Sequence, residues 1–441
     1  MKYPGIFSAL FGVCLQLIST TITAAEHDDL PYLLSLYENL HRNPEISFQE
    51  EKTAQRLAAE FADAGFNVTS KVGGYGVVAI LKNGNGPTVM LRTDMDALPV
   101  KEQTGKPYAS SATTVDEKGN TVPVMHACGH DIHMTTAVGT ARWLSAHRDQ
   151  WQGTVMIIAQ PAEERGAGSR AMLADGLFTR FPRPDYNLAL HVAADLPAGT
   201  VAYTRGYAMA NVDSVDILVK GIGGHGAYPH LAKDPVVLAA RIISDLQTLV
   251  SRELSPLDPG VITVGSIHGG TKRNVIPDSV KLELTVRSYS DEVRKQLLDG
   301  ITRIANAEAR SYGLPDNLLP EITYSDYYTP AVYNTPELTD QMLPVLRKAL
   351  GKNAVLEVLP VMGGEDFARY GRQEPLIPSH MFKLGSVAPD IVEQAKTSGS
   401  SLPSLHSAFF APEPKQSIRT GIKAMTAMVS ALLPVPDRDR K

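Results

Sequence analysis

Cysteine is scarce in this sequence, and runs of like charge, short repeats and long apolar segments are largely missing. Only two of the 441 residues are cysteines, which excludes a fold held together by many disulfides. The formal net charge of -5 is small for this length and favours neither a nucleic acid nor an anionic membrane as a partner. Beyond the N-terminal stretch, no segment is long and apolar enough to cross a membrane. The composition is that of a globular protein with two or three domains.

The N-terminal residues form a pattern of their own. Met1 and Lys2 precede an apolar run over residues 6–18, which is followed by polar residues and the pair Ala24-Ala25. This order predicts a signal peptide over residues 1–25, an exported (periplasmic or secreted) mature protein, and no stable membrane insertion after cleavage. The alternative is an N-terminal membrane anchor, for which the apolar run is short.

Removal of that segment leaves Cys128 as the only cysteine. A single thiol cannot form an internal disulfide, and in an oxidising compartment we expect it to be buried or bound to a metal. Cys128 lies in the stretch V-P-V-M-H-A-C-G-H-D-I-H (122–133), where His130 and two further histidines accompany it on a predicted strand-to-helix loop. Thiolate and imidazole are ligands for a borderline-soft divalent ion. The alternative is a histidine-rich loop around a small buried cysteine.

Most of the chain alternates between strand and helix patterns. Buried strands are predicted at 77–81, 88–92, 155–160, 188–191, 201–204, 355–359 and 381–384. Because helical patterns separate several of them, we predict an α/β fold with a mixed sheet flanked by helices on both faces. Two local predictions accompany it: a hairpin-like turn at Gly84–Gly86 between the first two strands, and a capping box of Ser47 and Glu50 at a helix start.

Residues 212–325 show a different order of elements. The patterns predict, in sequence, a strand at 215–219, a helix at 235–249, strands at 261–267 and 280–286, a helix at 291–312 and a strand at 321–324. The order β-α-β-β-α-β is that of a ferredoxin-like α+β sandwich. Since α/β patterns resume afterwards, we predict an inserted domain that interrupts a catalytic domain made of residues 26–211 and 326–441.

Several polar residues beyond the cysteine stretch lie at strand ends. Glu163 and Glu164 follow the strand 155–160 and, on an extended backbone, project to opposite sides, so that one could bind a metal while the other faces water. His191 ends another strand, and His406 precedes an apolar segment. Each alone has an ordinary structural explanation, as a solvated acidic turn or a hydrogen-bonded core histidine. Together they complete a candidate dinuclear metal set: Cys128, His130, Glu164, His191 and His406.

Other candidate residues are less specific. Asp94 and Asp96 follow the strand 88–92 and are either metal ligands, residues that orient a ligand, or turn residues that bind backbone amides. In the inserted domain, His225 lies in a glycine-rich loop that is otherwise a mobile turn. Asn274 and Arg287 offer an amide donor and a guanidinium, which suit a carbonyl oxygen and a carboxylate. The alternative for Arg287 is a surface salt bridge.

Six motifs in this order carry a family resemblance. They are H-x-x-P-E-x-S-F-Q-E (41–50), D-M-D-A-L-P (94–99), H-A-C-G-H-D (126–131), Q-P-A-E-E (160–164), G-G-H-G-A-x-P-H (223–230) and N-V-I-P (274–277). The sequence resembles the dinuclear-metal amidohydrolases and metallopeptidases typified by hippurate hydrolase, auxin-conjugate hydrolases and N-acyl-amino-acid amidohydrolases. More distantly it is similar to aminoacylases and carboxypeptidase G. The resemblance covers essentially all of the predicted mature chain.

The resemblance implies roles for these residues. It implies that the candidate set binds two divalent ions per subunit, manganese or zinc, with cobalt or nickel as alternatives, and that Glu163 is the general base. It implies that His225 donates to the developing oxyanion, often from the lid domain of a partner subunit in a homodimer or higher homo-oligomer. Asn274 and Arg287 match positions that bind the substrate carbonyl and carboxylate.

The function that the resemblance implies is hydrolysis of the amide bond of N-acyl or N-aroyl amino acids. The alternatives are an exopeptidase or dipeptidase of the same fold and, from a different class, a non-catalytic periplasmic binding protein. The intact Glu163 beside a full ligand set speaks against the binding protein. The sequence leaves open the role of Gly364-Glu-Asp-Phe367, the acyl group, the amino acid and the stereochemistry.

Overall fold

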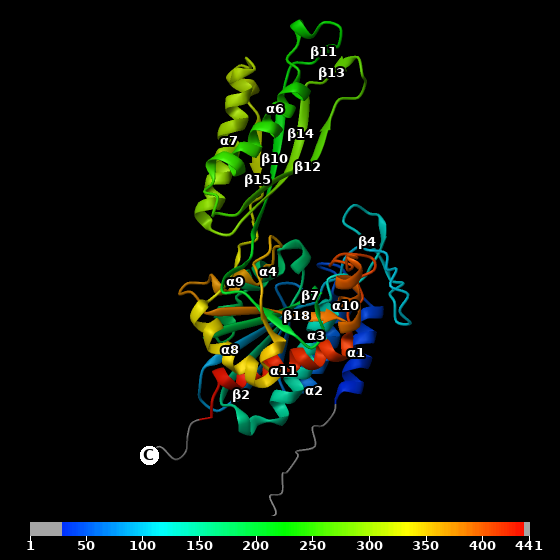
Figure 1. Cartoon of the computed structure of the whole chain (residues 1–441), viewed down its shortest axis with the longest axis vertical. Coiled ribbons are helices and arrows are strands. Elements are labelled where there is room, and N and C mark those ends of the chain that lie inside the picture. The colour runs from blue at the N-terminus through cyan, green and yellow to red at the C-terminus, as the bar shows by residue number, and fades with distance from the viewer. Residues whose placement is uncertain (1–28, 436–441) are drawn as a thin grey trace, which may run out of the picture.

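A computed structural model describes residues 29–435 of this chain. The predicted signal peptide, residues 1–25, lies outside this range. Among the described residues, none of the helices combines the length and apolar character needed to span a membrane. Figure 1 shows a large α/β body and a smaller body, formed by the middle of the chain, that extends away from it.

The large body is built on an eight-stranded mixed sheet, as predicted. Its strand order is β1-β2-β6-β3-β7-β18-β8-β17, and strands β6, β3, β7 and β18 run parallel to one another. The strands are β1 (Asn67–Val72), β2 (Gly76–Asn83), β3 (Thr88–Asp94), β6 (Gly153–Gln160), β7 (Tyr186–Pro197), β8 (Val201–Tyr203), β17 (Val355–Glu357) and β18 (Ser379–Val387). Because the four central strands are parallel, their carboxyl ends meet at one edge of the sheet.

Helices cover both faces of this sheet. One face is packed by α1 (Leu30–Arg42), α2 (Glu51–Asp63), α3 (His130–Ala146), α8 (Pro336–Leu350) and α11 (Pro414–Leu432). The other carries the shorter α4 (Gly168–Ala174), α5 (Leu177–Arg180) and α9 (Ala368–Gly371). Helix α1 illustrates the cause, because Leu33, Leu36 and Leu40 recur at helical spacing and are all buried. Helix α10 (Pro389–Ser398) and the pairs β4 (Thr113–Val115) with β5 (Thr121–Pro123), and β9 (Gly206–Met209) with β16 (Val332–Asn334), complete the body.

The small body has the predicted six elements in the predicted order. These are β10 (Asn211–Lys220), α6 (Pro235–Thr248), β12 (Gly260–Gly269), β14 (Ser279–Ser288), α7 (Asp291–Ser311) and β15 (Glu321–Tyr324). All three strand pairs are antiparallel, in the order β12-β14-β10-β15. Helices α6 and α7 close one face of this sheet over a separate apolar core. Its use as a lid or dimerisation domain stays a prediction.

Two local predictions were wrong. Strands β2 and β3 do not form a hairpin, because β6 lies between them, antiparallel to β2 and parallel to β3. Ser47 and Glu50 form no capping box, since α2 begins without a side-chain cap. The Ser47 hydroxyl donates to Asp96 at 2.6 Å, and a Glu50 carboxylate oxygen accepts from the amide of Ala162 at 2.8 Å. Both residues thus support the loops at the carboxyl ends of β3 and β6.

The chain turns sharply after β6. The amides of Ala167 and Gly168 both donate to the carbonyl of Ala162 at 3.2 Å, which folds residues 161–168 into a compact loop that carries the two predicted acids. Gly168 lies against the backbone in this loop, since an added Cβ would meet the carbonyl oxygen of Pro161 at 1.5 Å. Only glycine fits here without moving the loop.

We therefore expect Gly168→Ala to lower the free energy of unfolding by about 3 kcal/mol, because the new methyl group must displace backbone. The matched control is Gly265→Ala in β12, where the nearest heavy atom to an added Cβ is 3.9 Å away. We expect this change to alter stability by less than about 1 kcal/mol. Urea unfolding of the two variants measures the difference, and equal effects would contradict the steric argument.

Candidate metal centre

The predicted metal ligands converge where the parallel strands end. Cys128, His130 and His191 offer ligand atoms that all lie within 4.8 Å of one another, and the Cys128 Sγ is 3.5 Å from the His191 Nε2. Cys128 precedes Gly129, which has a φ of +76° and is the N-cap residue of helix α3. His130 is therefore the first residue of the helix rather than part of the predicted strand-to-helix loop.

A second group joins Cys128 to the remaining two predicted ligands. Glu164 and His406 form with Cys128 another set within 4.8 Å, and the His406 Nε2 is 3.5 Å from a Glu164 oxygen. His406 has a φ of +67°, and its amide donates to the carbonyl of Ala127 at 2.9 Å. This backbone bond fixes the C-terminal loop against the cysteine stretch, and the two groups, which share Cys128, bring all five side chains to one place.

The hydrogen bonds of the histidines test whether these residues suit a metal. The Nδ1 of His191 is 2.8 Å from the carbonyl of Val192, and the Nδ1 of His130 is 2.7 Å from the carbonyl of Asp96. In each ring, Nε2 is left on the side of the other candidate ligands: that of His191 near Cys128, and that of His130 near Glu164. The His130 Nε2 and one Glu164 oxygen are buried without a hydrogen-bond partner. Metal-binding histidines in proteins share this arrangement, and unpaired buried atoms of this kind need a cation or a donor.

The charge of the cavity also favours a cation. Burial alone lowers the pKa of His130, but Asp94 and Asp96 outweigh it and raise that pKa well above its usual value. Burial and the neighbouring Glu164 raise the pKa of the Cys128 thiol. A divalent ion would reverse this shift, because a coordinated thiol loses its proton.

Asp94 and His133 lie close to His130, and the three form a further candidate group. Both ring nitrogens of His133 are already in use, since Nδ1 is 2.6 Å from Asp94 and Nε2 accepts from the amide of Val192 at 2.9 Å. His133 is thus unsuited to bind a metal. It instead holds Asp94 and the strand that carries His191.

Glu163, the predicted general base, lies among the candidate ligands, since its carboxylate forms with His130 and Glu164 another group whose ligand atoms are within 4.8 Å of one another. It begins a short 3-10 turn (Glu163–Arg165) after Ala162, which has a φ of +50°, so the extended backbone predicted for the two acids was wrong. The Asp96 carboxylate accepts from the amides of Glu163 and Glu164 at 3.1 and 3.0 Å. The His130 Nε2 then lies 4.0 Å from Glu163 and 3.9 Å from Glu164, so both acids face the same histidine.

A buried arginine balances the acids behind the centre. The Arg92 guanidinium contacts Asp94 at 2.5 Å, Glu365 at 2.7 Å and Asp366 at 3.2 Å. Although burial opposes ionisation, Arg92 holds the pKa of Asp94 well below its usual range. Burial, followed by the charges of Glu365 and Glu164, raises the pKa of Glu163 well above its usual value. No pattern in the sequence points to Arg92, and the role of the loop with Glu365 and Asp366 was left open.

His41, the first residue of the motif at 41–50, lies behind α3, and no role was predicted for it. The His41 Nδ1 is 2.6 Å from Asp131, and its Nε2 is 3.1 Å from Glu102. All three side chains are almost fully buried. Burial lowers the pKa of His41, but the two carboxylates outweigh it and raise this pKa from 6.5 to about 9. The ion-paired His41 therefore links the end of α1 to the first turn of α3, next to His130.

The small body contains the three predicted substrate-contacting residues, and they lie in two different places. His225 in β11 (Gly224–His225) and Asn274, which precedes β13 (Val275–Ile276), are both exposed. The amide of Gly226 donates to the carbonyl of Asn274 at 2.9 Å, so these residues are neighbours. Figure 1 shows β11 and β13 at the tip of the small body, far from α3 and β7. Arg287 instead lies at its base, where Nη1 donates to the carbonyl of Met362 at 2.7 Å.

Comparison with known proteins identifies relatives of this chain. Residues 90–429 match peptidase family M20/M25/M40. The chain is 37% identical to an N-acetyldiaminopimelate deacetylase from Geobacillus sp., over 82% of this chain and 92% of the relative. It is 34% identical to thermostable carboxypeptidase 2 from Saccharolobus solfataricus, over 78% and 84% of the two chains. The solved structure of Bacillus subtilis YXEP, a dinuclear metal binding peptidase from the M20 family, is similar with a TM-score of 0.73 and 29% identity, over 92% and 98% of the chains.

The thiol provides a direct test of the candidate centre. We expect Cys128→Ala to weaken the binding of the metal at least roughly 10-fold, since even residues that only orient a ligand contribute that much. Metal content after dialysis against graded chelator measures this loss. His147→Ala is the control, because His147 lies at the end of α3, where its Nδ1 is 2.8 Å from the carbonyl of Trp143. Equal metal content in both variants would remove Cys128 from the set.

His41 predicts a dependence of stability on pH. Its pKa is raised on folding, so its contribution is complete below about pH 6.5 and is lost as the pH rises through about 9. The rise of the His41 pKa from 6.5 to about 9 corresponds to at most about 3 kcal/mol in the free energy of unfolding. The difference in free energy of unfolding between wild type and His41→Gln should therefore shrink between pH 6.5 and 9. Urea unfolding at several pH values, with His147→Gln as the control, measures it; a constant difference would argue against a charged His41.

Proposed function

This chain belongs to peptidase family M20/M25/M40, and from that membership we propose that it hydrolyses the amide bond of N-acyl or N-aroyl amino acids. That it is a metal-dependent hydrolase of amide or peptide bonds follows from the family match and from relatives that include a deacetylase and a carboxypeptidase. The choice of acyl-amino acids as substrates is our proposal.

One geometric observation supports this proposal most strongly. The five candidate ligands form two close groups that share Cys128, and the buried carboxylate of Glu163 faces the same His130 nitrogen as Glu164 does. We propose that Cys128, His130, Glu164, His191 and His406 hold two divalent ions. Thiolate and imidazole favour zinc, while the carboxylate also allows manganese, cobalt or nickel. When bound, such ions supply Lewis-acid chemistry and the activation of water.

The protein residues supply proton transfer and orientation. Glu163 is 8% exposed, and its burial, followed by the charges of the surrounding acids, raises its pKa, so that it accepts a proton more readily than a surface glutamate does. In the proposed reaction Glu163 takes a proton from the attacking water and then gives it to the leaving nitrogen. Asp96 keeps Glu163 in place, because its carboxylate accepts from the amides of both Glu163 and Glu164.

The small body supplies substrate contacts in this proposal. Arg287 is at the junction of the two bodies, where its guanidinium is available to the α-carboxylate of an acyl-amino acid. His225 and Asn274 are exposed at the tip, and we propose that they reach the substrate carbonyl in the cavity of a partner subunit. Export of the mature protein is also part of the proposal, and the mass of the mature N-terminus tests it.

The second candidate is an exopeptidase that cleaves dipeptides. It is favoured by the 34% identity to a carboxypeptidase, and the same residues would perform it. Activity of the metal-loaded enzyme on a panel of acyl-amino acids and dipeptides with shared C-terminal residues separates the two. Higher kcat/KM on dipeptides throughout the panel would reject the acyl-amino-acid proposal.

The base assignment generates a further prediction. Glu163→Gln should keep its metal but lose about 10²- to 10⁴-fold in kcat, because an amide side chain cannot accept the proton. The control is Glu117→Gln, since Glu117 is an exposed acid that pairs with Arg165. Metal content and turnover are measured on the same samples. If Glu163→Gln retained its turnover, another residue would have to be the general base.

A further inference from the structure

A large cavity opens beside the candidate metal centre. It has a volume of about 1020 Å³, enough for a small-molecule ligand. Two of its lining residues are the direct neighbours of candidate ligands, because Val192 follows His191 and Leu405 precedes His406. A substrate whose scissile bond lies at the centre would therefore extend into this cavity on one side.

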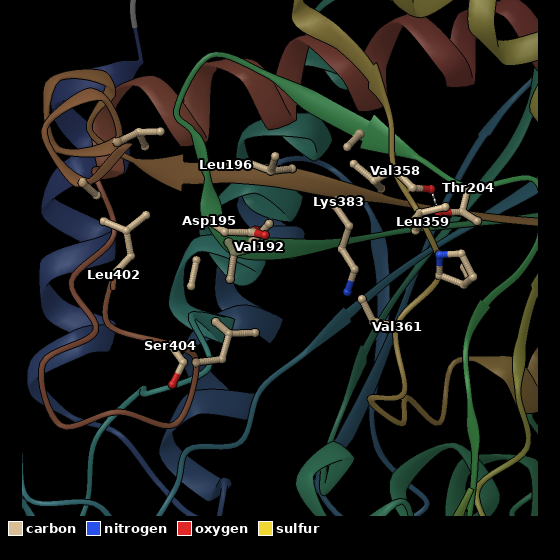
Figure 2. A pocket seen from close by; sticks show the side chains of 18 of the residues that line it. Val192, Asp195, Leu196, Thr204, Val358, Leu359, Val361, Lys383, Leu402 and Ser404 are labelled. Carbon is tan, nitrogen blue, oxygen red and sulfur yellow. Dashed lines mark hydrogen bonds between the residues drawn. The ribbon is translucent and has the colours of Figure 1, made fainter. Parts of the chain in front are cut away.

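The walls of the cavity are mainly apolar, but one lysine enters it. Lys383 lies on β18, directly across from His191 on β7 and from Ala202 on β8. Residues paired in this way project from the same face of a sheet, so Lys383 and His191 point to the same side. Figure 2 shows the Lys383 side chain crossing the open middle of the cavity, with its nitrogen toward Val361.

Lys383 has no ion-pair partner among residues 29–435. Among these residues its Nζ forms one hydrogen bond, to the Sδ of Met209 at 3.5 Å, a weak acceptor. The acids nearest to it, Glu365, Glu163 and Asp195, act on it electrostatically without forming an ion pair. The lining contains a single carboxylate, that of Asp195, which is exposed. A cation between apolar walls is unfavourable without an anion or a strong acceptor. The cavity is thus complementary to a ligand that carries a negative charge at some distance from its scissile bond.

We propose that this cavity holds the acyl group of the substrate and that Lys383 selects acyl groups that end in a second carboxylate, such as succinyl or glutaryl groups. Hydrolysis of such a substrate consumes one water and releases a dicarboxylic acid and an amino acid. The inference rests on the proposed function and narrows its substrate class. It assigns different carboxylates to different cations, the α-carboxylate to Arg287 and the acyl carboxylate to Lys383.

A matched substrate series tests this assignment. The metal-loaded enzyme is assayed on N-succinyl and N-butanoyl derivatives of one amino acid, and on the corresponding glutaryl and pentanoyl pair, which differ by charge at equal chain length. We expect kcat/KM to favour the charged member of at least one pair, and Lys383→Met to reduce that preference roughly 10- to 100-fold. Lys383→Arg should retain most of it.

Lys396→Met is the control, since Lys396 also lines the cavity but is exposed on α10. We expect it to leave the preference within about fivefold of wild type, as for a solvated charge. An equal effect of Lys383→Met and Lys396→Met would overturn the assignment. So would an equal loss on charged and neutral substrates, because Lys383 would then only offset the charge of the nearby acids.

A binding measurement separates this inference from the proposed function. Calorimetry with N-succinyl and N-butanoyl amino acids is performed on Glu163→Gln and on Glu163→Gln/Lys383→Met. Tighter binding of the succinyl compound that is lost with Lys383 supports the cavity assignment even where wild type cleaves only dipeptides. Equal binding of the two compounds to Glu163→Gln overturns it even where wild type hydrolyses acyl-amino acids.

Discussion

The buried guanidinium of Arg92 is the interaction on which the rest of the site depends. It contacts Asp94 on its own strand, and Glu365 and Asp366 from the C-terminal part of the chain. Without it, these buried carboxylates would lose the cation that they share in a medium of low dielectric constant, and the loss of one partner of a buried ion pair typically costs several kcal/mol. Arg92 thus joins the two halves of the large body that the small body separates in the sequence. Glu163 and Glu164, the two acids after β6, form no ion pair with an arginine among residues 29–435. Their negative charge makes the candidate metal centre suitable for cations.

The geometry of the centre follows from the direction of the strands. Strands β3, β6 and β7 are parallel neighbours, so Asp94, Glu163 and His191 all come from one edge of the sheet. Helix α3 begins at the same edge and brings His130. Backbone hydrogen bonds then set the spacing, since the amides after β6 donate to Asp96 and the amide of His406 donates to Ala127. Loops that are far apart in the sequence are therefore held by short, directional contacts.

Much of this could be predicted from the sequence, and the errors have a common cause. The fold class is confirmed. The convergence of the candidate ligands could be anticipated in part, because Glu164 follows β6 and His130 begins α3. The prediction that His191 ends a strand was wrong, since β7 continues to Pro197. The hairpin between β2 and β3 was wrong because turn chemistry at Gly84–Gly86 cannot reveal that a strand some 60 residues later in the chain inserts between them. Arg92 and Lys383 were missed for a related reason. A charged residue within an apolar strand gives no local sign of its partners, which are decided by the order of strands in the sheet.

The two locations of the small-body residues constrain how the site can be completed. Arg287 contacts the Met362 carbonyl across the junction, and Val361 beside it lines the cavity that Lys383 enters. One end of a substrate can therefore be contacted by residues of a single chain. Strand β11, which contains His225, lies at the far tip (Figure 1), so His225 cannot act on the same substrate in this arrangement. Stabilisation of the oxyanion by His225 thus requires either a large rotation of the small body or a second copy of the chain. A large rotation would break the contact of Arg287 with the Met362 carbonyl. A second copy would preserve this contact, and His225 is exposed on the tip, where such a copy could be reached.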